Sequence, residues 1–369
     1  MRITGIRLRP LRYPLDPPFS AAWDPEPRRA VGATLVFVDT DEGISGIGSG
    51  DTMDGFERFT ELFIGRDPLD LERHVRVLET IAFHAGRYWP FEAALWDLAG
   101  NVEGVPAARL LGGAAERVAA YASTGTLLPP QARAESALRL REVGLRALKL
   151  RIEKDRVEEG IATVAAVREA VGPDLAIMVD LNQGWRMPGD VEPLLGYDEV
   201  KRLATRLREL EITWLEEPLG RDDVDGLARL RAETGVPIAG GELARTPAEL
   251  DACLAADALD VYQPDGVLAV GILRAGELAR RVQARGFHFT PHTWTNGIGL
   301  LANLHLAAGV GAGPFLELPY DPPGWTPERR DFMLAEPVHP DTDGFLIPPD
   351  RPGLGIVLDD EAVERYAVV

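Results

Sequence analysis

Three acidic residues are spaced so that they could bind a divalent metal ion. Asp180, Glu216 and Glu242 each follow a short apolar segment, at steps of 36 and 26 residues. Three carboxylates that converge without a cation repel one another and raise one another's pKa, and a hard dication removes that cost. Oxygen-only ligands suit Mg²⁺, with water and substrate completing its shell. The alternative is that each carboxylate caps a helix or pairs with an arginine, but three in register favour the metal.

A histidine and two further acidic residues form a second candidate group. Asp265 and His292 end consecutive apolar segments. A carboxylate in that place can orient an imidazole and raise its pKa, which gives a general acid or base. Glu317 ends the last such segment and could donate a hydrogen bond or a proton to a developing oxyanion. A buried salt bridge between Glu317 and an arginine is an equally open alternative.

The basic residues are unevenly divided. Of the 39 Lys and Arg residues only three are lysines, Lys149, Lys154 and Lys201. Lys149 lies in the apolar segment 147–152, where strand alternation places it on the same inner face as Arg151. An amine kept at such a position is a candidate catalytic group, whereas compositional drift is the alternative for any single lysine.

These side chains lie at the ends of segments that we predict to be strands, with helical patterns between most of them. Eight alternating strands and helices predict a (β/α) barrel, in which functional residues gather at the C-terminal ends of the strands. An open doubly wound sheet is the alternative, weakened because no Gly-x-Gly-x-x-Gly follows a strand. The strands are expected at 120–124, 147–152, 176–182, 213–218, 237–242, 259–265, 287–292 and 315–320.

The two ends of the chain differ from this pattern. Residues 1–117 contain strand patterns up to about residue 50 and helical patterns afterwards, which is typical of an α+β domain. Residues 118–335 contain the barrel pattern. The segment 336–369 is rich in Pro and Gly at its start, and we expect it to fold back on the N-terminal domain.

Composition excludes several classes of function. The chain has 369 residues and a net charge of -19, which argues against nucleic acid as a partner. Its single cysteine, Cys253, excludes an intramolecular disulfide. No apolar run is long enough to cross a membrane, and the N-terminus lacks the apolar core of a signal peptide. We therefore expect a cytoplasmic protein without a membrane partner.

With these motifs in place, the sequence resembles the enolase superfamily, in its mandelate racemase subgroup, over nearly the whole chain. The resemblance implies an α+β capping domain, a modified TIM barrel of the (β/α)7β type and a returning tail. It implies Mg²⁺ bound by Asp180, Glu216 and Glu242, and an acid/base pair of His292 with Asp265. It also implies abstraction of a proton α to a carboxylate, with the metal stabilising the enediolate. The motifs are 179–185 (VDLNQGW), 214–218 (WLEEP), 240–242 (GGE), 263–265 (QPD) and 291–292 (PH).

One motif departs from the family pattern. The second barrel strand usually ends Lys-x-Lys with the second lysine as base, whereas here it is Lys149-x-Arg151. Arginine stays protonated and is a poor base, so we expect Arg151 to bind carboxylate or stabilise the enediolate. Lys149 could still act as base if Arg151 and the metal lower its pKa. The sixth strand has no lysine beside Asp265, which argues against the muconate-lactonising branch.

What remains resembles the acid-sugar dehydratases, which are carbon–oxygen lyases. We therefore expect an aldonate or aldarate, a small anionic sugar acid, to lose its β-hydroxyl and give a 2-keto-3-deoxy acid. The alternatives are a racemase, epimerase or cycloisomerase on a related carboxylate, or a barrel that binds a sugar acid without turnover. The resemblance also suggests a homo-oligomer.

Substrate contacts are expected from the barrel rim and from the capping domain. Asn182 shares a strand face with Asp180. The capping domain should close the site with residues of its two loops, and a plain surface loop is the alternative for each of them. The candidates are Trp23, Arg28, Arg29, Asp51 and Thr52.

Overall fold

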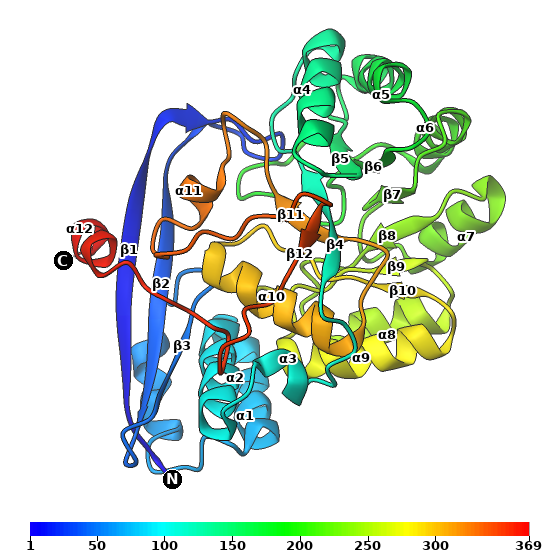
Figure 1. Cartoon of the computed structure of the whole chain (residues 1–369). Helices are drawn as coiled ribbons and strands as arrows, with labels where there is room; N and C mark the ends of the chain where they lie inside the picture. Colours follow the sequence, from blue (N-terminus) through cyan, green and yellow to red (C-terminus); the bar gives the residue numbers. More distant parts are fainter. Residues whose placement is uncertain (369) are drawn as a thin grey trace.

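The computed structural model describes residues 1–368, and its N-terminal part is a small antiparallel sheet with helices packed beside it (Figure 1). Gly46 and Gly48 allow the sheet to approach helix α2, since a Cβ at either would collide with the backbone of that helix. The strands, in the order β1-β2-β3, are β1 (Ile3–Phe19), β2 (Arg28–Thr40) and β3 (Ser45–Gly48). The helices are η1 (Phe56–Leu62, a 3-10 helix), α1 (Leu71–His84), α2 (Trp89–Glu103) and α3 (Ala107–Leu110).

The barrel follows as eight parallel strands with seven helices between them, which confirms the (β/α)7β expectation. Each of the eight expected strands is present, and seven of them are shorter than the pattern indicated. The strands are β4 (Val118–Ser123), β5 (Ala147–Arg151), β6 (Ala176–Asp180), β7 (Trp214–Glu216), β8 (Ile238–Gly240), β9 (Val261–Tyr262), β10 (His288–Phe289) and β11 (Leu316–Pro319). The helices are α4 (Pro130–Glu142), α5 (Val157–Val171), α6 (Tyr197–Glu209), α7 (Val224–Thr234), α8 (Pro247–Ala255), α9 (Ile272–Ala284) and α10 (Gly297–Val310).

The strands close into a ring. The order is β10-β9-β8-β7-β6-β5-β4-β11, so β4 to β9 each pair with the next strand in sequence, and β11, the last, pairs with β4, the first. The remaining gap between β10 and β11 is bridged by two hydrogen bonds, from Gly313 N–H to the Phe289 carbonyl (3.1 Å) and from Thr290 Oγ1 to the Phe315 carbonyl (2.6 Å). The open doubly wound alternative is therefore wrong, because such a sheet has two separated edge strands.

Large apolar side chains fill the lower part of the barrel. They come from six consecutive strands, one from each, and form a separate buried cluster inside the ring. This packed floor closes the barrel interior beneath the strand ends, where the site lies. The cluster consists of Tyr121, Ala147, Met178, Trp214, Ala239 and Val261.

The C-terminal segment contacts both parts of the molecule. Strand β12 (Phe345–Leu346) pairs antiparallel with the start of β4, on the barrel, and α12 (Asp360–Tyr366) packs on β1 (Figure 1). Val368 N–H donates to the Pro10 carbonyl at 2.9 Å. The expected return to the N-terminal domain is present, and the pairing with β4 adds a contact to the barrel that we did not expect. One short helix, α11 (Pro327–Arg330), precedes this segment.

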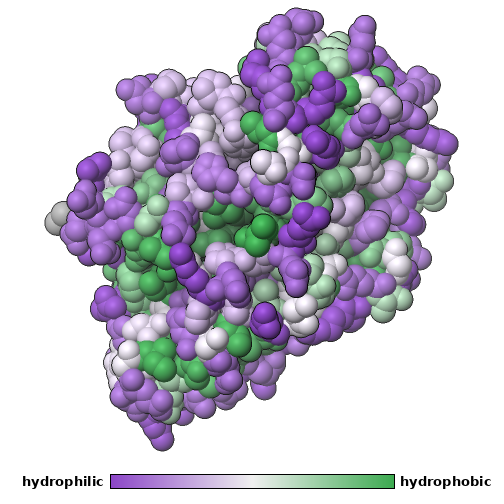
Figure 2. All heavy atoms as spheres, viewed as in Figure 1, coloured by the Kyte–Doolittle hydropathy of each residue, from purple (hydrophilic) through white to green (hydrophobic). Residues whose placement is uncertain are grey.

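The surface seen in Figure 2 is largely hydrophilic. On this face, hydrophobic residues gather between the N-terminal sheet and the barrel. Among residues 1–368, no helix is long and apolar enough to cross a membrane.

Candidate active site

A layer of polar side chains lies directly above the apolar floor of the barrel. Strand alternation creates it, because the residue two positions after each floor residue points to the same interior. Five of the six floor residues are followed in this way by a polar side chain, and Ala239 is followed by Gly241. All five of these side chains are buried to 1% exposure or less. They are Ser123, Lys149, Asp180, Glu216 and Gln263.

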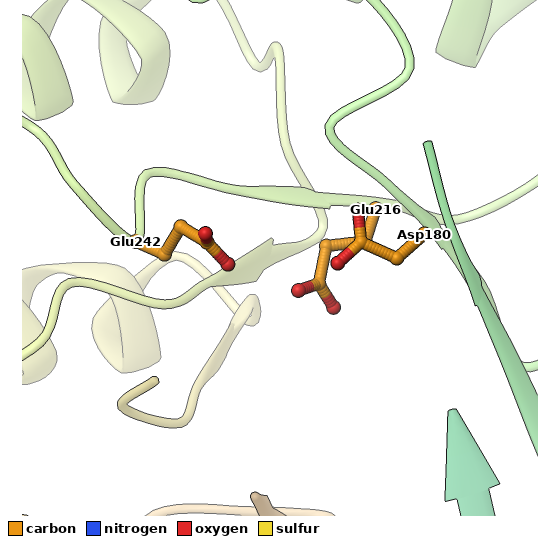
Figure 3. Close-up of side chains that lie close together, drawn as sticks. All are labelled: Asp180, Glu216 and Glu242. Atoms are coloured by element: carbon orange, nitrogen blue, oxygen red, sulfur yellow. The ribbon is translucent and has the colours of Figure 1, made fainter. Parts of the chain in front are cut away.

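Three carboxylates in and beside this layer could hold a metal ion. Asp180, Glu216 and Glu242 end β6, end β7 and follow β8, and they offer oxygens that all lie within 4.8 Å of one another. Figure 3 shows Glu242 approaching the other two carboxylates from the opposite side. Within residues 1–368, Glu242 Oε2 is buried without a hydrogen-bond partner. An all-oxygen, anionic set with an unpaired buried oxygen fits a hard dication.

The electrostatics of this cluster also favour a cation. Burial and the charges of Glu216 and Glu242 raise the pKa of Asp180, against the opposing effect of Arg151 and Lys149. Burial raises the pKa of Glu242 as well, with His292 opposing and Glu216 adding to the rise. These carboxylates are thus partly uncompensated, and a bound dication would favour their ionised forms.

Lys149 lies beneath the carboxylates and not at the substrate side. Its Nζ bonds to Glu216, lies 2.8 Å from Glu317 Oε1 and lies 3.5 Å from Asp180 Oδ2. Burial lowers its pKa, but Glu216 and Glu317 outweigh that and the net pKa is raised well above the usual value. These carboxylates therefore oppose the lowered pKa that a catalytic Lys149 would need, and its role as a base stays a prediction.

Arg151 occupies the next inner position of β5 and reaches the cavity. Its guanidinium bonds to Asp180 and donates to Asn182 Oδ1 at 2.9 Å and to Ser123 Oγ at 3.2 Å. It also lies over the ring of Trp23, 4.7 Å from the ring centroid. Lys149 and Arg151 thus share a face as expected, but they lie at different depths.

His292 and Asp265 form a closely bonded pair. His292 Nδ1 lies 2.9 Å from Asp265 Oδ2, and His292 Nε2 lies 3.8 Å from Glu242 Oε2. Burial lowers the pKa of His292, but Glu242, Glu317 and the bond to Asp265 raise it to about 9. The imidazole therefore lies beside the cluster of Asp180, Glu216 and Glu242. Its Nε2, the nitrogen that is not bonded to Asp265, is directed toward Glu242.

Asp265 is itself held by a residue that sequence reasoning missed. Asn303 on α10 donates to Asp265 Oδ1 at 3.0 Å and accepts from Gly266 N–H at 2.7 Å. It joins the loop after β9, which carries Asp265, to helix α10, which follows His292 in the chain. An asparagine within a helical apolar run gave no signal in the sequence.

Two other missed residues support the metal carboxylates. Trp185 Nε1 donates to Glu242 Oε1 at 2.5 Å, and Gln263 Nε2 donates to Glu216 Oε2 at 3.0 Å. Both residues lie inside the motifs quoted above, so the signal was present although no role was assigned to it. Such bonds orient metal-binding carboxylates.

Glu317 lies in a buried salt bridge, and its expected role as a hydrogen-bond or proton donor to an oxyanion stays a prediction. It accepts a hydrogen bond from Thr293 N–H at 2.8 Å and pairs with Lys149. Burial raises its pKa, but Lys149, His292 and Arg151 together bring it well below the usual range. The salt-bridge alternative is the observed one, although the partner is Lys149 and not an arginine.

The site opens into a cavity of about 680 Å³ between the barrel rim and the N-terminal domain. Arg151, Asn182, Glu242 and His292 line its barrel side. Four of the five candidate loop residues, Trp23, Arg28, Asp51 and Thr52, line its other side.

Two of the loop residues have environments that matter for binding. Arg28 is already paired with Asp24, with Nη2 2.9 Å from Oδ1. Burial raises the pKa of Asp51. Arg29 is the exception among the candidates, since it is exposed and lines shallow hollows beside the C-terminal segment.

Comparisons with known proteins agree with this geometry. Residues 132–362 match the family described as "Enolase C-terminal domain-like". The chain is 30% identical to D-galactarolactone cycloisomerase of Agrobacterium fabrum over 99% of both chains. It is 33% identical to arabinonate dehydratase of Saccharolobus solfataricus over 74% of this chain and 70% of the other. A racemase from Streptomyces coelicolor A3(2), solved with bound magnesium, superposes with a TM-score of 0.85 at 27% identity, covering 99% of this chain and 100% of the other.

Proposed function

This chain belongs to the enolase superfamily, in its mandelate racemase subgroup, and we propose that it is a Mg²⁺-dependent dehydratase of a sugar acid. The enzyme would remove the proton α to the substrate carboxylate and eliminate the β-hydroxyl. The product is a 2-keto-3-deoxy acid. Relatives with this chemistry and with neighbouring chemistries support the sugar-acid class.

Asp180, Glu216 and Glu242 are the residues that would hold the metal ion. When bound, Mg²⁺ supplies the positive charge that stabilises the enediolate formed from the substrate carboxylate. Trp185 and Gln263 keep two of the three ligands oriented through their hydrogen bonds. Lys149 lies beneath Glu216 and Glu317, and its positive charge favours the ionised forms of both.

His292 is the acid/base group in this proposal. In its neutral form the imidazole takes the α-proton, and the C–H electron pair moves into the developing enediolate. The electron pair then returns to expel the β-oxygen, and the imidazolium gives its proton to that oxygen, so that water leaves. The enol that remains takes a proton at the β-carbon and becomes the keto acid. Asp265 holds Nδ1 of the ring, and so keeps Nε2 directed to the substrate in both steps.

The observation that carries elimination over racemisation is the absence of an opposing base. Racemisation in one step needs acid/base groups on both faces of the α-carbon. None of the three lysines of the chain lines the cavity formed by residues 1–368. His292 lies beside Glu242, and the cation at Asp180, on the other side of the carboxylate cluster, is Arg151. A single imidazole can serve an elimination on one face, because it gives back the proton that it takes.

A cycloisomerase is the second candidate, and one observation favours it. The identity to D-galactarolactone cycloisomerase extends over 99% of both chains. The same residues would then expel a ring oxygen in place of a hydroxyl, and the ring would open without loss of water.

The test is a screen of mono- and diacid sugars with Mg²⁺, read by ¹H NMR in D₂O and by trapping of the 2-keto product. We expect a 2-keto-3-deoxy acid with loss of water and no turnover in His292→Asn, which should still bind Mg²⁺. Exchange of the α-hydrogen with solvent without loss of water would refute the dehydratase. A keto product of unchanged mass would favour the cycloisomerase.

Two expectations from the sequence stay predictions. We propose a homo-oligomer and a cytoplasmic location, and neither is needed for the chemistry above. Sedimentation of the purified protein and fractionation of the source cells would test them.

A further inference from the structure

Tryptophan is concentrated at the cavity far beyond its share of the chain. Four of the seven tryptophans line this one cavity. One of them, Trp185, bonds to Glu242 as described above. The other three, Trp23, Trp294 and Trp325, form a continuous aromatic wall with ring centroids 4.7 Å apart for the first pair and 5.5 Å apart for the second.

The aromatic wall is held rigidly. Phe19 packs behind it, 5.0 Å from Trp325 and 6.0 Å from Trp294. Trp294 Nε1 donates to Ser123 Oγ at 2.7 Å, which fixes that indole to the end of β4. Trp325 is 5% exposed, and its N–H has no hydrogen-bond partner among residues 1–368. Indoles with few torsions and fixed partners bind at low entropic cost.

The aromatic wall begins close to the reacting centre. The Arg151 guanidinium contacts the face of Trp23 and bonds to Asp180 at the same time. A substrate whose carboxylate binds at the cluster of Asp180, Glu216 and Glu242 would therefore place the carbon atoms beyond that carboxylate against the indoles.

The positive charges of the cavity are already committed. Arg28 pairs with Asp24, and Arg330 makes two bonds of 2.6 Å to Asp331. Arg329 donates to three backbone carbonyls, those of Asp16, Pro17 and Gly324. Arg329 has no carboxylate partner among residues 1–368, but these bonds use both of its terminal nitrogens. A second carboxylate bound at this end would therefore exchange its hydration for one guanidinium that is already partly bonded, which is costly.

We propose that the aromatic wall binds the non-polar face of a ring, and that the substrate is a cyclic sugar acid with a single carboxylate. The C–H groups on one face of a sugar ring form an apolar surface that packs on an indole, and the hydroxyls project from its edge. Asp51, Thr52 and Asn182 on the rest of the lining can bond to these hydroxyls. The inference rests on the proposed function, and it holds whether the oxygen expelled from the β-carbon is a hydroxyl or belongs to the ring.

The test measures binding without turnover. His292→Asn with saturating Mg²⁺ is titrated with four probes and followed by tryptophan fluorescence and calorimetry. D-Galactarolactone and 3,6-anhydro-L-galactonate are cyclic monoacids, D-galactonate is an open-chain monoacid, and galactarate is an open-chain diacid. We expect the cyclic probes to bind at least ten-fold more tightly than D-galactonate, and galactarate to bind most weakly.

A second variant tests the wall itself. Trp23→Ala, added to His292→Asn, should weaken the cyclic probes at least ten-fold and leave D-galactonate within two-fold. Arg29→Ala is the matched control in the same loop region, and it should change neither. Open-chain probes that bind as tightly as the cyclic ones, or an equal loss for all probes in Trp23→Ala, would overturn the inference and leave the proposed function standing. Failure of all four probes while Mg²⁺ binds would overturn both.

Discussion

Lys149 gives the sharpest test of how the polar layer is held together. It is fully buried, and it is the shared partner of Glu216 and Glu317, with Asp180 close by. The substitution Lys149→Met keeps the length of the side chain and removes its charge. Two buried carboxylates then lose their main counter-charge.

The size of the effect follows from burial. Removing one partner of a buried ion pair costs about 3–5 kcal/mol, because the remaining charge stays desolvated. Here both Glu216 and Glu317 are 0% exposed, so we expect the free energy of unfolding of metal-free Lys149→Met to fall by at least that amount. Mg²⁺ would restore part of the loss, since it supplies positive charge to Glu216. By linkage, added Mg²⁺ should stabilise the variant more than the unaltered protein.

Urea denaturation followed by circular dichroism, with EDTA or with Mg²⁺, measures both quantities. Lys154→Met is the matched control, because Lys154 is partly exposed and pairs with Asp190 at the surface. That variant should stay within about 0.5 kcal/mol of the unaltered protein. A loss below about 1 kcal/mol in metal-free Lys149→Met would refute the counter-charge role. So would an equal effect of Mg²⁺ on the variant and the unaltered protein.

Three further predictions follow from other parts of the structure. Chelation should abolish turnover, and Asp180→Asn should weaken Mg²⁺ binding measured by calorimetry; unchanged affinity would exclude Asp180 as a ligand. Burial lowers the pKa of His305 from 6.5 to about 4, so the folded state favours the neutral ring. The free energy of unfolding should therefore fall by about 3 kcal/mol as the pH falls from 6.5 to 4. His305→Gln should flatten that part of a stability–pH curve, and an unchanged slope would contradict the assignment. Gly46→Ala should cost roughly 1–3 kcal/mol in urea denaturation because its Cβ meets the Ala94 carbonyl, whereas Gly5→Ala, with ordinary contacts, should not.

The strand ends were the most predictable part of the molecule. A period of two fixes which residues face the barrel interior, and one βα unit per step fixes where each strand ends. This is why Asp180, Glu216 and Glu242 could be grouped from spacing alone. It is also why Asp265 and His292, which follow adjacent strands, were expected to meet.

Features that depend on loop paths could not be derived in this way. Trp294 and Trp325 follow β10 and β11 and meet Trp23 from the N-terminal domain, across more than 260 residues of chain. No periodicity relates these positions. The salt bridge between Lys149 and Glu317 was missed for a related reason, since it depends on which charges lie within about 4 Å and not on which strand carries them.

The pairing of lysine with arginine on β5 has a physical reason. Lys149 is a compact point charge whose single ammonium group lies close to Glu216, Glu317 and Asp180 at once. Arg151 needs its fork, because it bonds to Asp180, Asn182 and Ser123 while its face covers Trp23. The two cations are therefore not interchangeable, and preference for arginine across the chain does not explain either position.

The charge balance of the site also points to a dication. Glu217 lies outside this balance because it lines a separate hollow together with side chains of α7 and α8. Ionised forms of the other five carboxylates place five negative charges around Lys149, Arg151 and His292. With the imidazole protonated, two negative charges remain, and a single Mg²⁺ neutralises them. Loss of a proton from His292 would then leave its neutral imidazole as the base of the proposed reaction. The five carboxylates are Asp180, Glu216, Glu242, Asp265 and Glu317.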